Sequence, residues 1–235
     1  MTPATAASAP APVVEPEGLC GVNICARRAE MGGFCTDHRE EQNQSHRDWR
    51  EEHVRSQRRF WLEGIGLPKM YWGATFADAR PTASIKALLA YRDAKGGPRG
   101  RAVILASQTG TGKTYAAACL VNDVLPFLAS RQRFILGAEL VRDLLNFKTV
   151  ERTMEDAAGV PLLVIDDLQE PPRAEGLALL EELLIRRHAD GRPLVVTTNL
   201  RRQPFEAAFG DRISDRLKDW GTYHELPGKS LRGGA

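Results

Sequence analysis

Residues 107–114 have the sequence Ser-Gln-Thr-Gly-Thr-Gly-Lys-Thr, and they lie between the apolar run 102–106 and the alanine-rich run 115–121. This order predicts a strand, a glycine-rich loop and a helix. Such a loop presents successive backbone N–H groups at a helix N-terminus, where the helix dipole favours a polyphosphate. The stretch, called the phosphate loop below, therefore predicts a nucleotide site. A chance glycine turn between a strand and a helix is the competing interpretation.

Single residues of the phosphate loop have separate expected roles. Lys113 is expected to reach the β- and γ-phosphates, and the Thr114 hydroxyl is expected to bind Mg²⁺. The full pattern G-x-x-x-x-G-K-[ST] has glycine where this chain has Ser107, and because serine is small we expect it to be tolerated. The expected nucleotide-binding residues are Ser107, Gln108, Thr109, Gly110, Thr111, Gly112, Lys113, Thr114 and Tyr115.

Length and composition limit the class of protein. A chain of 235 residues with 43% hydrophobic residues is large enough for one α/β domain and a small appendage. The formal net charge of +2 argues against a protein that coats nucleic acid through bulk charge, so any DNA contact must be local. No apolar run approaches the roughly 20 residues of a membrane span, and the N-terminus has no secretory pattern. We therefore expect a cytoplasmic protein with no membrane partner.

The N-terminal part divides into two expected segments. Residues 1–17 are rich in Ala, Pro and Thr and are expected to be a disordered tail. Residues 18–40 contain the spacing Cys-x4-Cys-x9-Cys-x2-His, which resembles a small zinc knuckle and suits a tetrahedral, structural Zn²⁺ site that folds the segment. The expected zinc ligands are Cys20, Cys25, Cys35 and His38. Scattered cysteines beside an unrelated histidine are the alternative.

Residues 41–63 are highly charged and contain no Pro or Gly, which predicts a helical linker. Several arginines lie beside Trp49, Phe60 and Trp61, an arrangement compatible with stacking on single-stranded bases. A solvated helical face is the simpler interpretation, and we adopt it. The fourth cysteine, Cys119, follows the phosphate loop among alanines and is expected to be buried.

From residue 64 to 235, apolar segments alternate with amphipathic ones, which predicts a parallel sheet covered by helices on both faces. Strands are expected at 102–106, 133–136, 161–168, 193–199 and 223–226. The helix expected at 174–188 is predicted to turn inward the side chains of Leu177, Leu180, Leu184 and Ile185.

Polar side chains follow two of the expected strands. Asp166 and Asp167 end one of them, and Asn199 ends the next. Parallel sheets gather ligands at the carboxyl ends of their strands, so we expect these residues to meet the phosphate loop. Asp166 fits a Mg²⁺ ligand, Asp167 fits a group that polarises the attacking water, and Asn199 fits a hydrogen-bond partner of that water or of the γ-phosphate. A strand-end turn is the alternative for the aspartates, and a turn cap for Asn199.

Together these motifs resemble the AAA+ ATPases of the DnaC/IstB group. The resemblance rests on the phosphate loop, Leu-Val-Ile-Asp-Asp-Leu at 163–168, Val-Thr-Thr-Asn-Leu at 196–200 and Gly-Asp-Arg-Ile-Ser-Asp-Arg-Leu at 210–217. Stretches 66–76 and 226–232 extend it over residues 64–235. It implies an AAA+ three-layer α/β sandwich with a central five-stranded parallel sheet and no C-terminal lid.

The resemblance also implies roles for individual residues. By this resemblance, Asp166 and Asp167 are the Walker B aspartates, and Asn199 is sensor 1. The arginine finger is assigned to Arg216, with Arg212 as the alternative. Such a finger acts on the nucleotide of a neighbouring subunit, so the resemblance implies self-association through the ATP sites. Ordinary surface ion pairs are the competing interpretation of both arginines.

The function that we expect is ATP-dependent loading of a hexameric replicative helicase, with ATP, Mg²⁺ and Zn²⁺ as cofactors. The N-terminal module is expected to bind the helicase, and the ATPase domain to bind single-stranded DNA. A transposition helper of the same group that acts on duplex DNA is one alternative. An adaptor that clamps nucleotide with little turnover is another, for which Ser107 and the aspartate at position 167 leave room.

Overall fold

The computed structural model describes residues 55–94, 101–128, 131–227 and 230–231. All of them belong to one compact unit, Ser45–Ala235. The expected tail at 1–17, the zinc segment at 18–40 and the first part of the linker at 41–63 lie outside the described residues.

Five parallel strands form the central sheet, in the order β2-β3-β4-β1-β5. Their bounds are β1 (Ala102–Ala106), β2 (Gln132–Leu136), β3 (Leu162–Asp166), β4 (Leu194–Thr198) and β5 (Gly221–Glu225). Every residue of β1, β3 and β4 is buried, as expected for strands covered on both faces. The prediction of an α/β fold with a five-stranded parallel sheet is confirmed.

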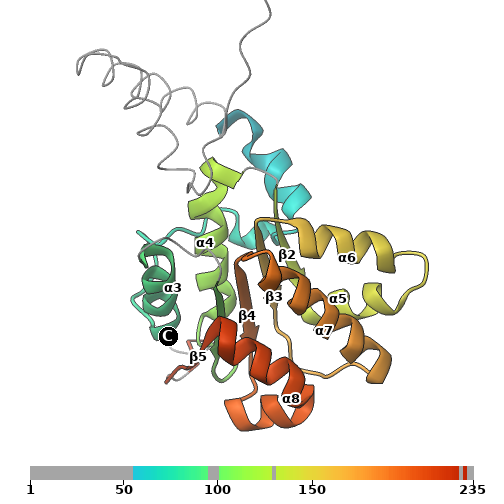
Figure 1. The fold of residues 1–235 in the computed structure, drawn as a ribbon. Coiled ribbons are helices and arrows are strands. Elements are labelled where there is room, and N and C mark those ends of the chain that lie inside the picture. Colours follow the sequence, from blue (N-terminus) through green and yellow to red (C-terminus); the bar gives the residue numbers. More distant parts are fainter. Residues whose placement is uncertain (1–54, 95–100, 129–130, 228–229, 232–235) are drawn as a thin grey trace, which may run out of the picture. The chain divides into compact units, whose positions relative to one another are not determined.

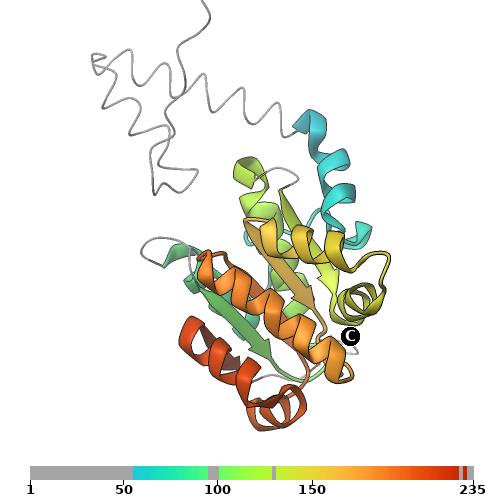
Figure 2. The same ribbon diagram turned by 45° about the vertical axis from the view of Figure 1, so that its right-hand side comes forward.

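Helices cover both faces of this sheet (Figure 1). Alternate residues of β1 point to opposite faces: Val103 and Leu105 join one apolar cluster, and Ala102 and Ile104 join the other. The first cluster contains α3 (Ala83–Asp93) and α4 (Lys113–Leu128), where Cys119 is fully buried as predicted. The second contains α5 (Gly137–Leu145), α6 (Val150–Gly159), α7 (Ala174–Ala189) and α8 (Arg202–Trp220). Figure 2 shows α7 and α8 side by side on that second face.

The buried side of α7 differs from the prediction. Ile185 is 38% exposed, whereas Arg187 is fully buried. Leu180, Leu183, Leu184 and Arg187 have the spacing i, i+3, i+4, i+7, so Arg187 occupies the apolar face and Ile185 lies beside it. A charged residue is accepted there because its guanidinium donates hydrogen bonds to backbone oxygens.

Arg187 ties the C-terminal end of α6 to the start of β4. Its guanidinium donates to Ala157 O at 2.7 Å and Val160 O at 2.9 Å, and also to Pro193 O. A helix C-terminus carries partial negative charge, which favours a cation. Burial nevertheless lowers the pKa of Arg187 to about 9. The side chain therefore stabilises an end of α6 whose carbonyl groups lack helical partners.

The chain reaches the sheet through an N-terminal helical segment. Residues 55–65, called the linker helix below, are helical, and Leu62 and Ile65 pack into the first apolar cluster. A short 3-10 turn, η1 (Lys69–Tyr71), follows before α3. Within the described segments, no helix combines the length and the apolar character that crossing a membrane requires.

Candidate functional site

The phosphate loop connects β1 to α4, as the sequence predicts. Helix α4 begins at Lys113, so the loop ends at a helix N-terminus. Gly110 and Gly112 have φ angles of 84° and 87°, which side chains with a Cβ atom rarely adopt. These two glycines let the backbone curl and leave its N–H groups beside the α4 N-terminus, an arrangement that suits an anion.

Lys113 is 7% exposed and lies at the centre of the site. Its ammonium group donates to Ser107 O at 2.8 Å, Gln108 O at 3.0 Å and Asn199 Oδ1 at 2.8 Å. Burial lowers the pKa of Lys113, and the nearby Asp167 and Asp166 act in the opposite direction. A positive charge held among neutral oxygens in this way can transfer its hydrogen bonds to phosphate oxygens.

Ser107 occupies the position of the first pattern glycine without backbone strain. Among the described non-glycine residues, only Asp167 has a positive φ, so Ser107 needs no glycine conformation. Its N–H donates to Thr198 O at 3.3 Å and extends the pairing of β1 with β4. Its hydroxyl forms a hydrogen bond with the Thr111 hydroxyl inside the loop. The serine therefore contributes a cross-link of the loop that glycine cannot make.

Asp166 is positioned for a metal ion at the end of β3. It is 4% exposed, and its Oδ1 accepts hydrogen bonds from Thr114 Oγ1 at 3.0 Å and Thr197 Oγ1 at 2.6 Å. Burial raises the pKa of the Asp166 carboxyl, and the two hydroxyl donors oppose this rise. A carboxylate beside the hydroxyl of Thr114 supplies the oxygen ligands that Mg²⁺ prefers, so the residues fit the ion. Thr197, one strand away, was not predicted from the sequence.

Asp167 lies in the left-handed region with φ of 57°. Its N–H donates to Thr197 Oγ1 at 2.9 Å, and its Oδ1 accepts from Asn199 Nδ2 at 3.3 Å and from the Gln169 side chain. A non-glycine residue keeps a positive φ only where surrounding contacts hold it there, and such residues are enriched at functional sites.

The three expected strand-end residues meet the phosphate loop. Asp166 contacts Thr114, and Asn199 contacts both Lys113 and Asp167.

These residues line a cavity of about 860 Å³ at the carboxyl ends of the strands. Residues 109–114 of the phosphate loop line it with Asp166, Asp167, Thr197 and Asn199, and Tyr115 also lines it. The sequence did not predict a second group of lining residues, which combines the apolar or aromatic side chains of Pro68, Met70, Tyr71 and Ile85 with Asp78, Arg80 and Thr82. A lining with both a phosphate-binding loop and apolar side chains suits a molecule that has phosphates and a flat base.

Leu231, near the C-terminus, is a further lining residue that the motifs did not indicate. Its N–H donates to Gly110 O at 2.8 Å, and a Cβ at Gly112 would lie 3.5 Å from its side chain. Just after β5, Leu226 N donates to Ala106 O at 2.7 Å. Leu231 is therefore part of the cavity wall.

Arg212 and Arg216 lie outside this cavity, on the second arm of α8. Gly210, with φ of 79° and ψ of 166°, kinks α8 and separates the arm 202–209 from the arm 211–220. The Arg212 side chain is 86% exposed and lies 3.9 Å from Glu181. The Arg216 side chain has neither a hydrogen bond nor an ion pair within the described part of the chain. Neither candidate finger residue lines the cavity.

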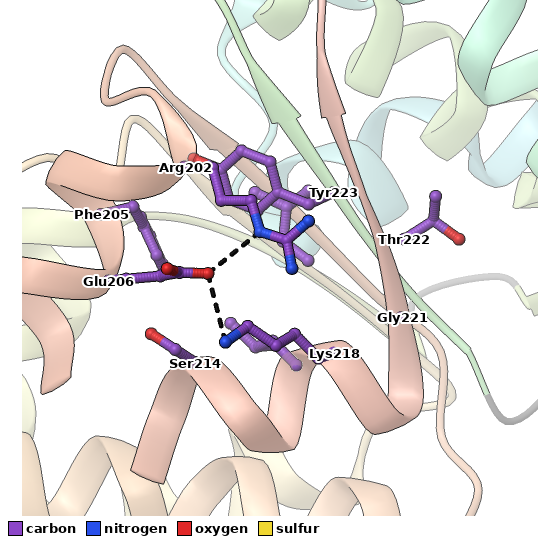
Figure 3. Close-up of a pocket in the computed structure, with 10 residues that line it drawn as sticks. Arg202, Phe205, Glu206, Ser214, Lys218, Gly221, Thr222 and Tyr223 are labelled. Carbon is purple, nitrogen blue, oxygen red and sulfur yellow. Dashed lines mark hydrogen bonds and ion pairs between the residues drawn. The ribbon is translucent and has the colours of Figure 1, made fainter. Parts of the chain in front are cut away.

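A second cavity, of about 270 Å³, lies between the two arms of α8 and the strands β1 and β5. Figure 3 shows Glu206 of the first arm between Arg202 and Lys218, to which it forms contacts of 3.0 Å and 3.3 Å. These contacts lower the pKa of Glu206, chiefly through Arg202. Lys218 belongs to the second arm, so the bridge joins the arms across the kink and helps to fix the direction of the arginine-bearing arm.

The expected zinc ligands, Cys20, Cys25, Cys35 and His38, lie outside the described residues. Within 55–94, 101–128, 131–227 and 230–231, no group of three or more His, Cys, Asp or Glu side chains has metal-binding geometry. The zinc site therefore remains a prediction.

No family model matches the chain. Among curated proteins, the uncharacterized protein YqaM of Bacillus subtilis strain 168 is 26% identical over 134 residues, which are 53% of this chain and 43% of YqaM. The replicative helicase loader DnaC of Escherichia coli strain K12 is 26% identical over 123 residues, 49% of each chain. The matches thus span about half the length of these relatives.

Solved structures match over more of the chain. A structure of DnaI superposes with a TM-score of 0.57 and 20% identity, covering 72% of this chain and 99% of the DnaI chain. The DnaC helicase loader gives 0.55 and 19%, covering 68% and 100%. The chain therefore shares its fold with the DnaI and DnaC structures. The initiator DnaA bound to AMPPCP and single-stranded DNA also superposes, at 0.52 and 15%, over 70% of this chain and 52% of the DnaA chain. This fold places the phosphate loop, Asp166 and Asn199 at one end of the sheet.

Proposed function

We propose that this chain is a Mg²⁺-dependent ATPase that loads a hexameric replicative helicase onto single-stranded DNA in the cytoplasm. The observation that carries the proposal is the contact between Lys113 and Asn199 beside Asp166, in a fold shared with DnaC and DnaI. The 26% identity to the helicase loader DnaC supports loading over other uses of the fold. Because that match covers half of each chain, the partners and the coupled process are part of the proposal.

The proposed chemistry is hydrolysis of the γ-phosphate. Lys113 and the loop N–H groups bind the phosphates, and Thr114 and Asp166 hold Mg²⁺, which neutralises charge on the phosphate oxygens. Asp167 accepts a proton from the attacking water, and Asn199 orients that water or the γ-phosphate. The hydrogen bond from Asn199 Nδ2 to Asp167 Oδ1, at 3.3 Å, supports this division because it holds both groups together beside Lys113, which also contacts Asn199.

Self-association is part of the proposal, because both candidate finger arginines lie outside their own cavity. Arg216 is the proposed finger, and Arg212 is the alternative. Mixing Lys113→Ala subunits with Arg216→Ala subunits provides the test. If fingers act between subunits, some mixed sites contain both an intact cavity and an intact finger, so the mixture should recover ATPase activity that neither variant has alone. Recovery in the mixture made with Arg212→Ala instead would move the assignment to Arg212.

We place single-stranded DNA on the turn between α5 and α6. Phe147 is 84% exposed there, and the ammonium group of Lys148 lies 5.7 Å from its ring centre. An exposed ring beside a cation suits base stacking next to a phosphate. Phe147→Ala should weaken binding of a single-stranded oligonucleotide about tenfold. Phe60→Ala, on the linker helix where the ring is 71% exposed, is the control, and a larger loss there would contradict this placement.

The N-terminal module is proposed to bind the helicase through a segment folded by zinc. Purified protein should contain one zinc per chain, and Cys25→Ser should remove it. To test loading, the full chain is mixed with its cognate hexameric helicase, and helicase binding is compared with that of a chain lacking residues 1–54, which keeps the linker helix with Arg58 and Leu62. Truncation should abolish binding while ATP binding remains. Intact helicase binding after truncation, or ATPase stimulation by duplex rather than single-stranded DNA, would contradict the proposed function.

A further inference from the structure

Asn122 joins three elements that are distant in the sequence. It lies on α4, is 8% exposed, and uses both ends of its amide. Its Nδ2 donates to Tyr71 O at 3.0 Å and to Ala118 O at 2.9 Å, and its Oδ1 accepts from Arg58 Nη2 at 2.5 Å. The proposed nucleotide chemistry uses none of these contacts.

Arg58 holds the same backbone segment. Its Nη2 also donates to Trp72 O at 2.7 Å, so the carbonyl groups of Tyr71 and Trp72 are bound by Asn122 and Arg58 respectively. Arg58 belongs to the linker helix and is half-buried, and burial lowers its pKa. Its guanidinium donates to two neutral oxygens, Trp72 O and Asn122 Oδ1. A partly desolvated cation depends on such hydrogen bonds, so a shift of the linker helix that breaks them would cost free energy.

The backbone segment that Asn122 and Arg58 hold, Tyr71–Trp72, borders the proposed nucleotide cavity through Tyr71. Met70 and Tyr71 line this cavity, and the Tyr71 ring lies edge-on to Tyr115, with ring centres 6.4 Å apart. Tyr115 directly follows Lys113 and Thr114 in α4. Asn122 belongs to the same helix, so one helix carries both the end of the phosphate loop and the residue that holds Tyr71. Asn122 lies nine positions after Lys113, about 13 Å along the axis. If phosphates occupy the loop, the apolar lining that includes Met70 and Tyr71 remains for the base.

We infer that Arg58 and Asn122 are positioning residues for the base of the bound nucleotide, and that Arg58 makes nucleotide affinity depend on the placement of the linker helix. This inference rests on the proposed function. Its consequence is that a partner bound to the chain before residue 55 changes ATP affinity through a contact outside the phosphate loop.

The test separates base contacts from phosphate contacts. Binding of ATP and of inorganic tripolyphosphate to the full chain is measured by calorimetry for Arg58→Met and for its neighbour Arg59→Met. Arg59 is a matched control on the same helix, because its side chain is 79% exposed and forms a surface ion pair with Glu63. Arg58→Met should lose ATP affinity on the order of tenfold and keep tripolyphosphate affinity, while Arg59→Met should change neither.

A second variant keeps the inference testable if Arg58→Met folds poorly. Asn122→Asp has nearly the same shape and still accepts from Arg58, but it has no N–H for Tyr71 O. It should also lose ATP affinity and retain tripolyphosphate affinity. ATP binding by Arg58→Met equal to that of Arg59→Met, or equal losses for both ligands, would overturn the inference. A wild-type chain that binds neither ligand would instead overturn the proposed function.

Discussion

The ammonium group of Lys113 donates a 2.8 Å hydrogen bond to Asn199 Oδ1, which joins the phosphate loop to the carboxyl end of β4. Asn199 donates in turn to Asp167, just beyond β3. One amide thus connects residues that follow three neighbouring strands, β1, β4 and β3. Loss of this amide should disturb the placement of both charged groups.

Asn199→Ala is expected to reduce ATP turnover more than ATP binding. The lysine keeps two backbone acceptors in the loop, so nucleotide affinity should fall only a few-fold, whereas kcat should fall about 100-fold. Steady-state kinetics with a parallel ATP titration measures both quantities. Asn146→Ala, in the exposed turn before α6, serves as the control when both assays are run without DNA. Unchanged kcat in Asn199→Ala would show that the amide only caps the strand.

Asp166→Asn is expected to stabilise the nucleotide-free protein. Burial raises the folded-state pKa of Asp166 above its unfolded value, so stability falls as pH rises from the unfolded pKa through the folded pKa. The ionised carboxylate therefore costs stability at neutral pH. Asparagine keeps an oxygen acceptor for Thr114 and Thr197 without the charge, and a gain of about 1 kcal/mol corresponds to about 2–4 °C in Tm.

Thermal unfolding across a pH series checks this prediction. The difference in Tm between Asp166→Asn and wild type should shrink as pH falls below the folded pKa, where the wild-type carboxyl is also protonated. The same substitution should abolish the Mg²⁺ dependence of nucleotide binding. A variant less stable than wild type at neutral pH would mean that the two threonine hydrogen bonds outweigh desolvation.

Arg187→Met should destabilise the fold by about 3 kcal/mol. The substitution removes the hydrogen-bond donor of the carbonyl groups of Ala157, Val160 and Pro193. It also removes a buried charge, but the stability gained in this way offsets only part of the loss. Its neighbour provides a matched control: Arg186 pairs with Glu182 on the surface, so Arg186→Met should change stability by no more than about 0.5 kcal/mol. Urea unfolding compares them, and equal stabilities would contradict the assigned role.

Gly210→Ala tests the kink in α8. Among the described residues, no atom beyond its chain neighbours and the adjacent backbone of α8 lies within 4 Å of the position that a Cβ at Gly210 would take, yet its backbone angles belong to a region that only glycine adopts readily. We expect a loss of about 1–3 kcal/mol from backbone strain alone. Gly64 also has open space around it and is helical, so Gly64→Ala should be neutral or stabilising. Denaturant titrations that rank the two variants in the reverse order would refute the strain argument.

Strand positions and strand-end residues were predictable because they follow local patterns. The apolar run before the phosphate loop became β1 with the expected bounds, and Asp166, Asp167 and Asn199 converged because parallel strands share a carboxyl edge. The tolerance of Ser107 was also predictable from its size. Its hydrogen bond with Thr111 was not, because that bond depends on how the loop curls.

Contacts between distant segments had no local signal. Leu231 reaches Gly110 through the path of the chain after β5, and Arg58 reaches Asn122 across 64 positions. The burial of Arg187 was missed because arginines are usually exposed. The backbone oxygens that accept its hydrogen bonds come from other elements and cannot be recognised in the local sequence. The apolar lining of the cavity was missed because no sequence motif marks it: residues of η1 and α3 form it only after these elements pack on α4.

The central claim is that the cavity at the carboxyl ends of the strands binds ATP through Lys113. Titration calorimetry of ATP with Mg²⁺ into the wild-type chain and into Lys113→Ala tests it most directly. Loss of charge-assisted hydrogen bonds to phosphate should weaken binding by about 100-fold in the variant, while the wild-type chain binds one ATP per chain. Equal affinity in the two proteins, or no binding by the wild-type chain, would contradict the claim.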